Sequence, residues 1–227
     1  PCDRDSLLGA LEAARRKLIV PVLVGPPARI RAVAEANGAD ISGLRLVATE
    51  HSHASAAAAV ALARGGEVEM LMKGSLHTDE ILGFIVASQS GLRTERRVSH
   101  VFVMDVPAYP RLLFVTDAAV NIFPTLDDKV DIVQNAIDLA RTLGIEKPKV
   151  AVLSALEMVT SKIESTLHAA ALCKMADRGQ ITGGEIDGPL AFDNAISVHA
   201  AKAKKIASSV AGRADILLVP DLEAGNM

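Results

Sequence analysis

Residues 73–78 bring together groups that hold phosphate in proteins. Lysine, serine and threonine in this segment can each donate a hydrogen bond to a phosphate oxygen, and glycine lets the backbone approach closely. A helix expected from Thr78 would add free N–H groups in its first turn. An ordinary capped turn, with Thr78 as the N-cap and His77 exposed, explains the same residues, so both interpretations stay open. The candidate phosphate-binding residues are Lys73, Gly74, Ser75, His77 and Thr78.

Three arginines gather in a short loop before an expected strand. Guanidinium groups grip phosphate through two parallel hydrogen bonds, so Arg93, Arg96 and Arg97 are candidate anion-binding residues. Solvated loop charge is the commoner explanation of such a run, and Glu95 can neutralise part of it.

Two further segments follow expected strands, where ligands gather in wound α/β sheets. The segment 182–194 contains Asp187, which could bind a metal or act as a base, although aspartate also serves in turns and caps. The segment 220–226 follows the last expected strand with no helix expected after it. The residues of interest are Asp187, Gly188, Pro189, Pro220, Asp221, Gly225 and Asn226.

Apolar periodicity indicates the elements that must position these residues. Helices are expected at residues 6–16, 28–36, 54–64, 78–87, 125–143, 164–176 and 191–199. Strands are expected at 18–24, 44–47, 68–72, 101–105, 111–117, 149–153, 180–186 and 214–219. The alternation of strands and helices predicts an α/β fold with a mainly parallel sheet. The short connection between 101–105 and 111–117 predicts one antiparallel pair, hence a second domain or a mixed sheet.

Composition excludes several functional classes. The chain has 227 residues, 50% of them hydrophobic, with a formal net charge of −3, which argues against bulk attraction to nucleic acid or to an anionic membrane. Only 3% of residues are aromatic, too few for base-stacking platforms. Cys2 and Cys173 show no CxxC spacing, so neither a disulfide scaffold nor a zinc site is expected. Without an apolar run of about 18 residues or a signal-peptide pattern, we expect a cytoplasmic protein, trimmed at Pro1.

With these segments in place, the chain resembles the phosphate acetyl/butyryltransferase family, most closely its butyryl-type branch. The matching segments run in the expected order along the whole chain: 1–5, 22–25, 73–78, 99–107, 116–121, 131–136, 187–190 and 220–226. The transferase part of bacterial proteins that join it to a hydratase-like domain is the most similar. Gly83 stands where the acetyl-specific branch has an arginine, and Tyr109 stands where that branch has a cysteine; both differences favour the butyryl-type branch.

The resemblance implies a reversible acyl transfer in which acyl-CoA and phosphate give acyl phosphate and CoA. It also implies a two-domain, three-layer α/β/α fold similar to isocitrate and isopropylmalate dehydrogenases, and a homodimer. The first domain would span residues 1–98 and be completed by a later segment that this sequence lacks; the second would span 99–227. CoA serves as a substrate, and neither a metal nor a prosthetic group is expected.

The resemblance further implies how the candidate residues divide. The segment 73–78 would line the phosphate or acyl-phosphate site, while the residues of interest in 187–189 and 220–226 would line the opposing wall of the cleft. In the family the CoA thiol attacks the acyl phosphate directly, helped by a carboxylate, while arginine and main-chain donors bind the phosphate. The family's Ser-Arg stretch and its nearby aspartate would lie beyond Met227, so no catalytic residue is assigned.

Two other functions fit the sequence less well. A metal- and NAD-dependent decarboxylating dehydrogenase on the same fold would need an aspartate cluster and an arginine set, whose spacing the sequence does not show. A CoA- or phosphate-binding module without activity is the alternative outside enzymology. Binding of CoA without turnover would favour that module.

Overall fold

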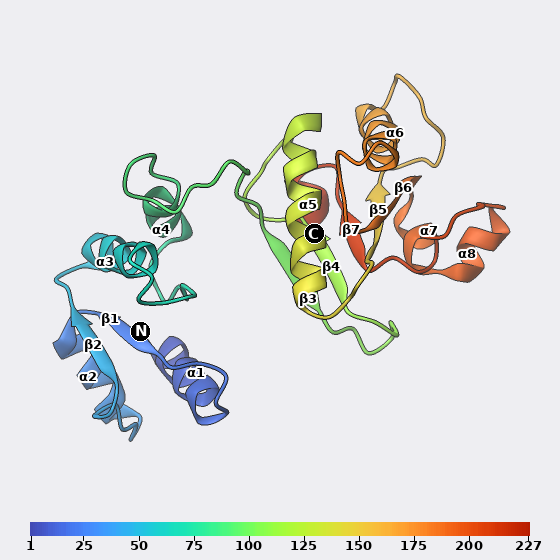
Figure 1. Ribbon diagram of the computed structural model, residues 1–227. Coiled ribbons are helices and arrows are strands. Elements are labelled where there is room, and N and C mark those ends of the chain that lie inside the picture. Colours follow the sequence, from blue (N-terminus) through green and yellow to red (C-terminus); the bar gives the residue numbers. More distant parts are fainter. The chain divides into compact units, whose positions relative to one another are not determined.

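The computed structural model describes all residues, Pro1–Met227, which divide into Pro1–Glu95 (unit 1) and Arg96–Met227 (unit 2). The division lies between Glu95 and Arg96 rather than between residues 98 and 99. That a later segment completes the first domain stays a prediction. Figure 1 shows the elements of each unit. None of the helices combines the length and the apolar character that are needed to cross a lipid bilayer.

Unit 1 is built on two parallel strands covered by helices. Its elements are α1 (Arg4–Arg15), β1 (Val22–Gly25), α2 (Pro27–Ala36), β2 (Arg45–Ala48), α3 (Ser52–Arg64) and α4 (Thr78–Ile85). The strands run parallel because α2 crosses between them. Leu7, Leu23 and Ile30, one from each of α1, β1 and α2, are at most 3% exposed and form the core. The carboxyl ends of both strands therefore lie at one edge of this unit.

Two strand predictions in unit 1 are wrong in whole or in part. The run 18–24 forms a strand only from Val22, because Leu18 and Val20 are 72% and 93% exposed and pair with no neighbour. The run 68–72 forms no strand, since no other strand lies beside it; Met70 is 74% exposed. Leu18, Val20 and Met70 thus face solvent instead of a sheet.

Unit 2 contains a five-stranded sheet of order β3-β4-β7-β5-β6. Its strands are β3 (Val101–Met104), β4 (Leu113–Thr116), β5 (Lys149–Leu153), β6 (Glu185–Leu190) and β7 (Ile216–Leu218). Its helices are α5 (Leu126–Thr142), α6 (Glu164–Asp177), α7 (Phe192–Ile196), α8 (Val198–Ala203) and α9 (Leu222–Asn226). The antiparallel β3–β4 pair was predicted, and the other neighbouring strands are parallel.

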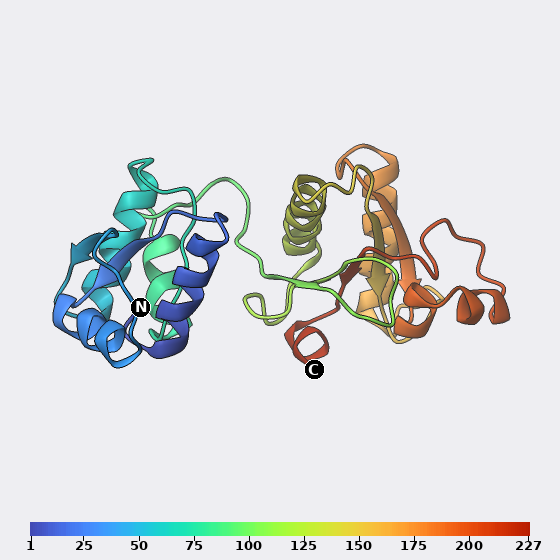
Figure 2. The same ribbon diagram turned by 90° about the horizontal axis from the view of Figure 1, so that it is seen from below.

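Helices cover both faces of this sheet (Figures 1 and 2). One core joins β4, β5 and β7 to α5 and α6, and includes the fully buried Ile132 and Leu172. The other core includes Ala195 of α7 and Ala201 of α8. Helix α5 begins where the sequence predicts, because the Thr125 hydroxyl accepts from the Asp128 N–H while the Asp128 carboxylate accepts from the Thr125 N–H.

Three predictions in unit 2 need correction. Strand β6 begins at Glu185 rather than at residue 180, because Ile181 is buried in the core from a loop. The single helix expected over 191–199 is two short helices, α7 and α8, that meet at Ser197. Residues 222–226 form the helix α9, because the Asp221 carboxylate caps it through the Ala224 N–H.

Candidate active site

A pocket of about 370 Å³ opens in unit 1 beyond the carboxyl ends of β1 and β2. Pro26 and Arg29 come from the segment after β1, and Ser52 begins the helix after β2. The loop 73–78 closes the pocket. Its residues in the lining are Gly74, Ser75, Leu76 and His77. The segment that the sequence marks for phosphate thus lies at the edge where parallel sheets bind ligands.

Glu80 organises the mouth of this pocket. Its carboxylate accepts from the Ser52 hydroxyl at 2.8 Å and from the His77 backbone N–H at 3.0 Å, and it lies 3.2 Å from Nε2 of His53. The hydrogen bond from Ser52 is the main reason that the pKa of Glu80 lies below its usual value, followed by the bond from His77. Glu80 therefore fixes the start of α4 and places a negative charge beside the pocket.

Within the loop, the candidate residues have different roles. The Lys73 ammonium donates to the carbonyl oxygens of Gly74 at 3.1 Å and Leu76 at 2.9 Å, so it closes the loop and does not line the pocket. Thr78 is the first helical residue, and His77 takes the N-cap position. A side chain at Gly74 would come within 3.2 Å of the Ser6 hydroxyl. Glycine at this position therefore lets the loop lie against α1.

Two other residues in the lining of the pocket suit an anion. Arg29 supplies a guanidinium to the lining of the pocket. Ser75 lines the same space with a hydroxyl. A phosphate group has the size and the charge that such a set accommodates. The negative charge of Glu80 opposes this binding.

Two of the three candidate arginines have partners in unit 2. The Arg96 guanidinium pairs with Asp138 at 2.5 Å, and that of Arg97 pairs with Asp128 at 3.0 Å. The Arg97 side chain also donates to Asn121. Arg93 is exposed in unit 1. Arg96 and Arg97 thus hold the start of unit 2 against α5 through these ion pairs.

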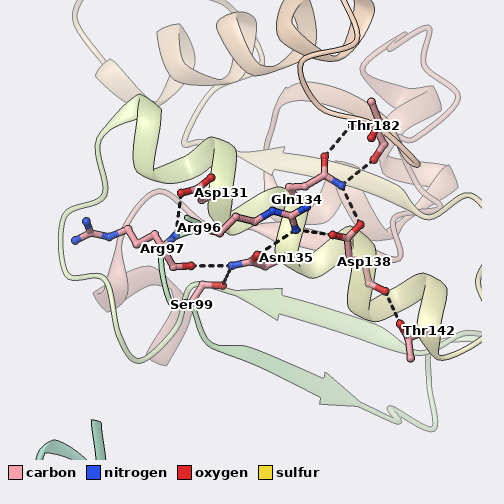
Figure 3. A network of polar contacts seen from close by, with 9 residues as sticks. All are labelled: Arg96, Arg97, Ser99, Asp131, Gln134, Asn135, Asp138, Thr142 and Thr182. Atoms are coloured by element: carbon pink, nitrogen blue, oxygen red, sulfur yellow. Dashed lines mark hydrogen bonds and ion pairs between the residues drawn. The ribbon is translucent and has the colours of Figure 1, made fainter. Parts of the chain in front are cut away.

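Figure 3 shows how one face of α5 extends this attachment. The Asp131 carboxylate accepts from the Arg97 backbone N–H, and the Asn135 amide donates to the Arg97 carbonyl, both at 2.9 Å. One turn away, the Gln134 side chain donates to the Thr182 carbonyl at 3.0 Å and accepts from the Thr182 N–H at 2.9 Å. This network holds two distant segments against one helix.

The residues 187–189 lie inside β6 and not in a loop beyond a strand. The Asp187 carboxylate accepts from the Gly188 N–H at 2.8 Å. A side chain at Gly188 would come within 2.7 Å of the Val152 carbonyl oxygen and 2.9 Å of its Cβ. Gly188 therefore has a packing role between β6 and β5, whatever the role of Asp187 and Pro189.

The segment 220–226 also has a structural explanation. A side chain at Gly225 would come within 2.9 Å of the Asp117 carbonyl oxygen, and the Asn226 amide donates to the Ala118 carbonyl at 3.0 Å. Pro220 directly precedes the cap residue Asp221. These contacts hold α9 against the turn that follows β4 (Figure 2).

Among the pocket residues that sequence reasoning missed are Arg29, Ser52 and Glu80. Arg29 follows the Gly-Pro-Pro turn after a strand, and this position beyond a strand end could have indicated it. Glu80 stands three residues after His77, the spacing of a capping box. Ser52 carries no such signal, because only the parallel pairing of β1 and β2 brings it near.

Comparison with known proteins places the chain in one family. The sequence model of the family described as "Phosphate acetyl/butaryl transferase" matches residues 48–227. A phosphate acetyltransferase of Rhizobium meliloti is 63% identical over all of this chain and 72% of its own length. One of Rickettsia felis is 58% identical over all of this chain and 65% of its own length. A phosphate butyryltransferase of Clostridium beijerinckii is 42% identical over 99% of this chain and 74% of its own length.

Solved structures agree with the predicted fold class. A branched-chain phosphotransacylase from Enterococcus faecalis V583 has 28% identity and a TM-score of 0.75, over 90% of this chain and 82% of that chain. The EutD phosphotransacetylase from Staphylococcus aureus has 20% identity and a TM-score of 0.77, over 99% of this chain and 77% of that chain, which shows the fold alone. The α/β fold class is thereby confirmed. The chain belongs to the phosphate acetyl/butyryltransferase family.

Proposed function

We propose that this chain carries out reversible acyl transfer, in which acyl-CoA and phosphate give acyl phosphate and CoA. The observation that carries the proposal is the pocket of unit 1, where Arg29 and Ser75 line a space suited to phosphate. The loop 73–78, whose residues 74–77 line that pocket, lies within the part matched by the family model. The similar proteins are named for acyl transfer, which does not favour a dehydrogenase.

The pocket residues suggest how the reaction is assisted. Arg29 would compensate the charge of the phosphate as it leaves an acyl phosphate, and the Ser75 hydroxyl would donate to it. The attacking CoA thiol must lose its proton, since the thiolate is the nucleophile. We assign no general base. The residues Asp187, Gly188, Pro189, Pro220, Asp221, Gly225 and Asn226 remain proposed as a second substrate-contacting set, and the transfer is proposed to need no prosthetic group.

The acyl group is proposed by analogy with the named relatives. The Rhizobium and Rickettsia proteins, at 63% and 58% identity, are named acetyltransferases, whereas the Clostridium protein, at 42%, is named a butyryltransferase. Acetyl phosphate is therefore the first substrate to test. The preference for butyryl that the sequence resemblance implies stays a prediction.

We also propose a homodimer in the cytoplasm. An apolar hollow of about 1090 Å³ in unit 2 has Phe102, Met104 and Phe192 in its lining. These three side chains are 42–56% exposed, and burial of such a surface against a second copy would be favourable. Sedimentation equilibrium at several concentrations tests the assembly; a monomer at all concentrations would contradict it.

The activity is tested by thioester formation from CoA with acetyl phosphate and with butyryl phosphate. Turnover with either donor, accompanied by phosphate release in equal amount, is the expected result. Binding of CoA without turnover in the longest natural protein that contains this sequence would replace the proposal by a binding module.

A further inference from the structure

His53 contacts the carboxylate at the rim of the pocket in unit 1. Its Nε2 lies 3.2 Å from Oε1 of Glu80, and Glu80 lines the pocket whereas His53 does not. The side chain of His53 is 66% exposed and that of Glu80 is 16% exposed. The imidazole therefore reaches the pocket only through Glu80, while solvent can supply it with a proton.

Two residues of α4 hold the imidazole in place. Glu80 and Phe84 are four residues apart, so they lie on the same face of that helix. The rings of His53 and Phe84 meet edge to face, with 6.3 Å between their centroids and 76° between their planes. Helix α3, whose first turn contains His53, packs against α4. The contact between His53 and Glu80 is thus part of the packing of these two helices.

A proton on His53 changes the charge of this pair without changing its hydrogen bond. Nε2 can donate to the carboxylate from the neutral imidazole as well as from the imidazolium. Glu80 stays ionised near neutral pH, because the bonds from Ser52 and from the His77 N–H hold its pKa below the usual value. The pair therefore has one negative charge when His53 is neutral and no net charge when His53 is protonated. Histidine is the side chain that ordinarily changes charge between about pH 5 and pH 8.

Other ionisable groups surround this pair and must be separated from His53. Asp79 is the other acid of α4 and does not line the pocket, and β1, which also packs against α3, has no ionisable side chain. His51 accepts from the Ala54 N–H through Nδ1 at 3.2 Å, and this bond requires the unprotonated nitrogen. His77 lines the pocket itself, so its titration acts alongside that of His53.

A structural role alone does not explain the pair. An ion pair with a largely exposed partner contributes little to stability, and the bond from Ser52 already joins α3 to Glu80. The imidazole adds a charge that can be gained and lost beside the proposed phosphate pocket. An anion binds more weakly beside an uncompensated carboxylate than beside a pair without net charge, and such effects extend over about 10 Å at an ionic strength of about 0.1 M.

We propose that His53 is a positioning residue for the transferase that acts through Glu80: its imidazolium form offsets the charge of the Glu80 carboxylate, so the pocket binds the phosphate group of the substrate more tightly as the pH falls. The inference rests on the proposed function, because it takes this pocket as the phosphate site. The neutral imidazole leaves the charge of Glu80 uncompensated, and the affinity for the anion is therefore lost as the pH rises.

The test is titration calorimetry with sulfate at low ionic strength. Sulfate is the probe because it keeps its charge where phosphate gains a proton. Wild type should bind sulfate about threefold or more tightly at about pH 5.5 than at about pH 8.5. His53→Gln keeps a donor but no charge, and it should bind sulfate more weakly than wild type by about threefold or more at the low pH and equally at the high pH. His53→Lys, which stays charged, should bind more tightly than wild type at the high pH.

His199→Gln is the matched control, since His199 is an exposed histidine of α8 in unit 2. It should follow wild type at every pH, and the Tm of His53→Gln should lie close to that of wild type. Equal sulfate profiles for wild type and His53→Gln would overturn the inference, and so would the absence of sulfate binding to wild type. If His53→Gln does not fold, the comparison of His53→Lys with wild type at the high pH decides.

The two failures can be told apart. A wild-type protein that shows the expected sulfate profile but forms no thioester would contradict acyl transfer and leave the role of His53 standing. Turnover by wild type, together with sulfate profiles that do not differ between wild type and His53→Gln, would contradict the role of His53 alone.

Discussion

The hydroxyl of Ser52 donates to the carboxylate of Glu80 with 2.8 Å between Oγ and Oε1, and this bond joins the starts of α3 and α4 at the rim of the pocket in unit 1. The same carboxylate accepts from the His77 N–H. The pocket thereby keeps its shape at the cost of a negative charge beside the proposed phosphate. The balance between these two effects can be measured.

Glu80→Gln should strengthen phosphate binding. Glutamine carries no charge, and its one carbonyl oxygen can still accept from the His77 N–H while its NH2 group donates to the Ser52 hydroxyl oxygen. We expect the KM for phosphate to fall a few-fold, measured as thioester phosphorolysis at varied phosphate. The control is Asp79→Asn, the neighbouring acid of α4, which does not line the pocket. A higher KM for Glu80→Gln than for wild type would show that its charge does not oppose the substrate.

Arg29→Gln should weaken phosphate binding. The substitution removes the guanidinium from the pocket lining. We expect the KM for phosphate to rise about tenfold or more while the Tm changes little, because the side chain is exposed. Arg31→Gln is the matched control, since Arg31 is exposed on the same helix and does not line the pocket. Equal kinetics for the two variants would remove Arg29 from the proposed site.

Gly188→Ala should destabilise unit 2. The added Cβ would lie 2.7 Å from the Val152 carbonyl oxygen, which is shorter than a normal contact distance, so β5 and β6 must shift. We expect a loss of about 1–3 kcal/mol in the free energy of unfolding, measured with urea. Gly9→Ala is the control, because a Cβ at Gly9 in α1 meets nothing within 4 Å and alanine favours a helix. An unchanged stability for Gly188→Ala would leave a substrate contact as the reason for this glycine.

Glu185 should stabilise the fold most above pH 4.5. Its carboxylate lies 2.7 Å from Lys149 Nζ and 2.9 Å from Lys147 Nζ, and these bonds lower its pKa to about 2 from 4.5. Because the folded pKa lies below the unfolded value, the stabilisation is complete above pH 4.5 and disappears as the pH falls toward 2. The stability difference between wild type and Glu185→Gln, from urea unfolding, should shrink over this range.

A matched glutamate separates this effect from general acid sensitivity. Glu146 is exposed and makes no ion pair, so Glu146→Gln should give no stability difference that changes in the same window. A constant difference for Glu185→Gln between pH 5 and pH 2 would contradict the role of the two lysines.

Local signals in the sequence were sufficient for several elements of unit 2. Helix α5 was predicted because Thr125 and the acids of its first turn form a capping box, and β5 was predicted from a continuous apolar run. Strand β6 was displaced because the apolar Ile181 enters the core from a loop. Periodicity shows that a residue is apolar but not whether the backbone beside it has a strand partner.

The site was only partly predictable for a similar reason. The loop 73–78 has a recognisable composition, and it does line a pocket. Arg29 and Ser52 reach that pocket from the ends of β1 and β2, and this depends on the parallel register between Val22–Gly25 and Arg45–Ala48.

The central claim is tested most directly by thioester formation from CoA and acetyl phosphate in wild type and in Arg29→Gln, with butyryl phosphate as the second donor. The account predicts turnover by wild type with at least one donor. It also predicts that the catalytic efficiency of Arg29→Gln is lower than that of wild type by about tenfold or more. No turnover with either donor, by a folded protein that binds CoA, would contradict it.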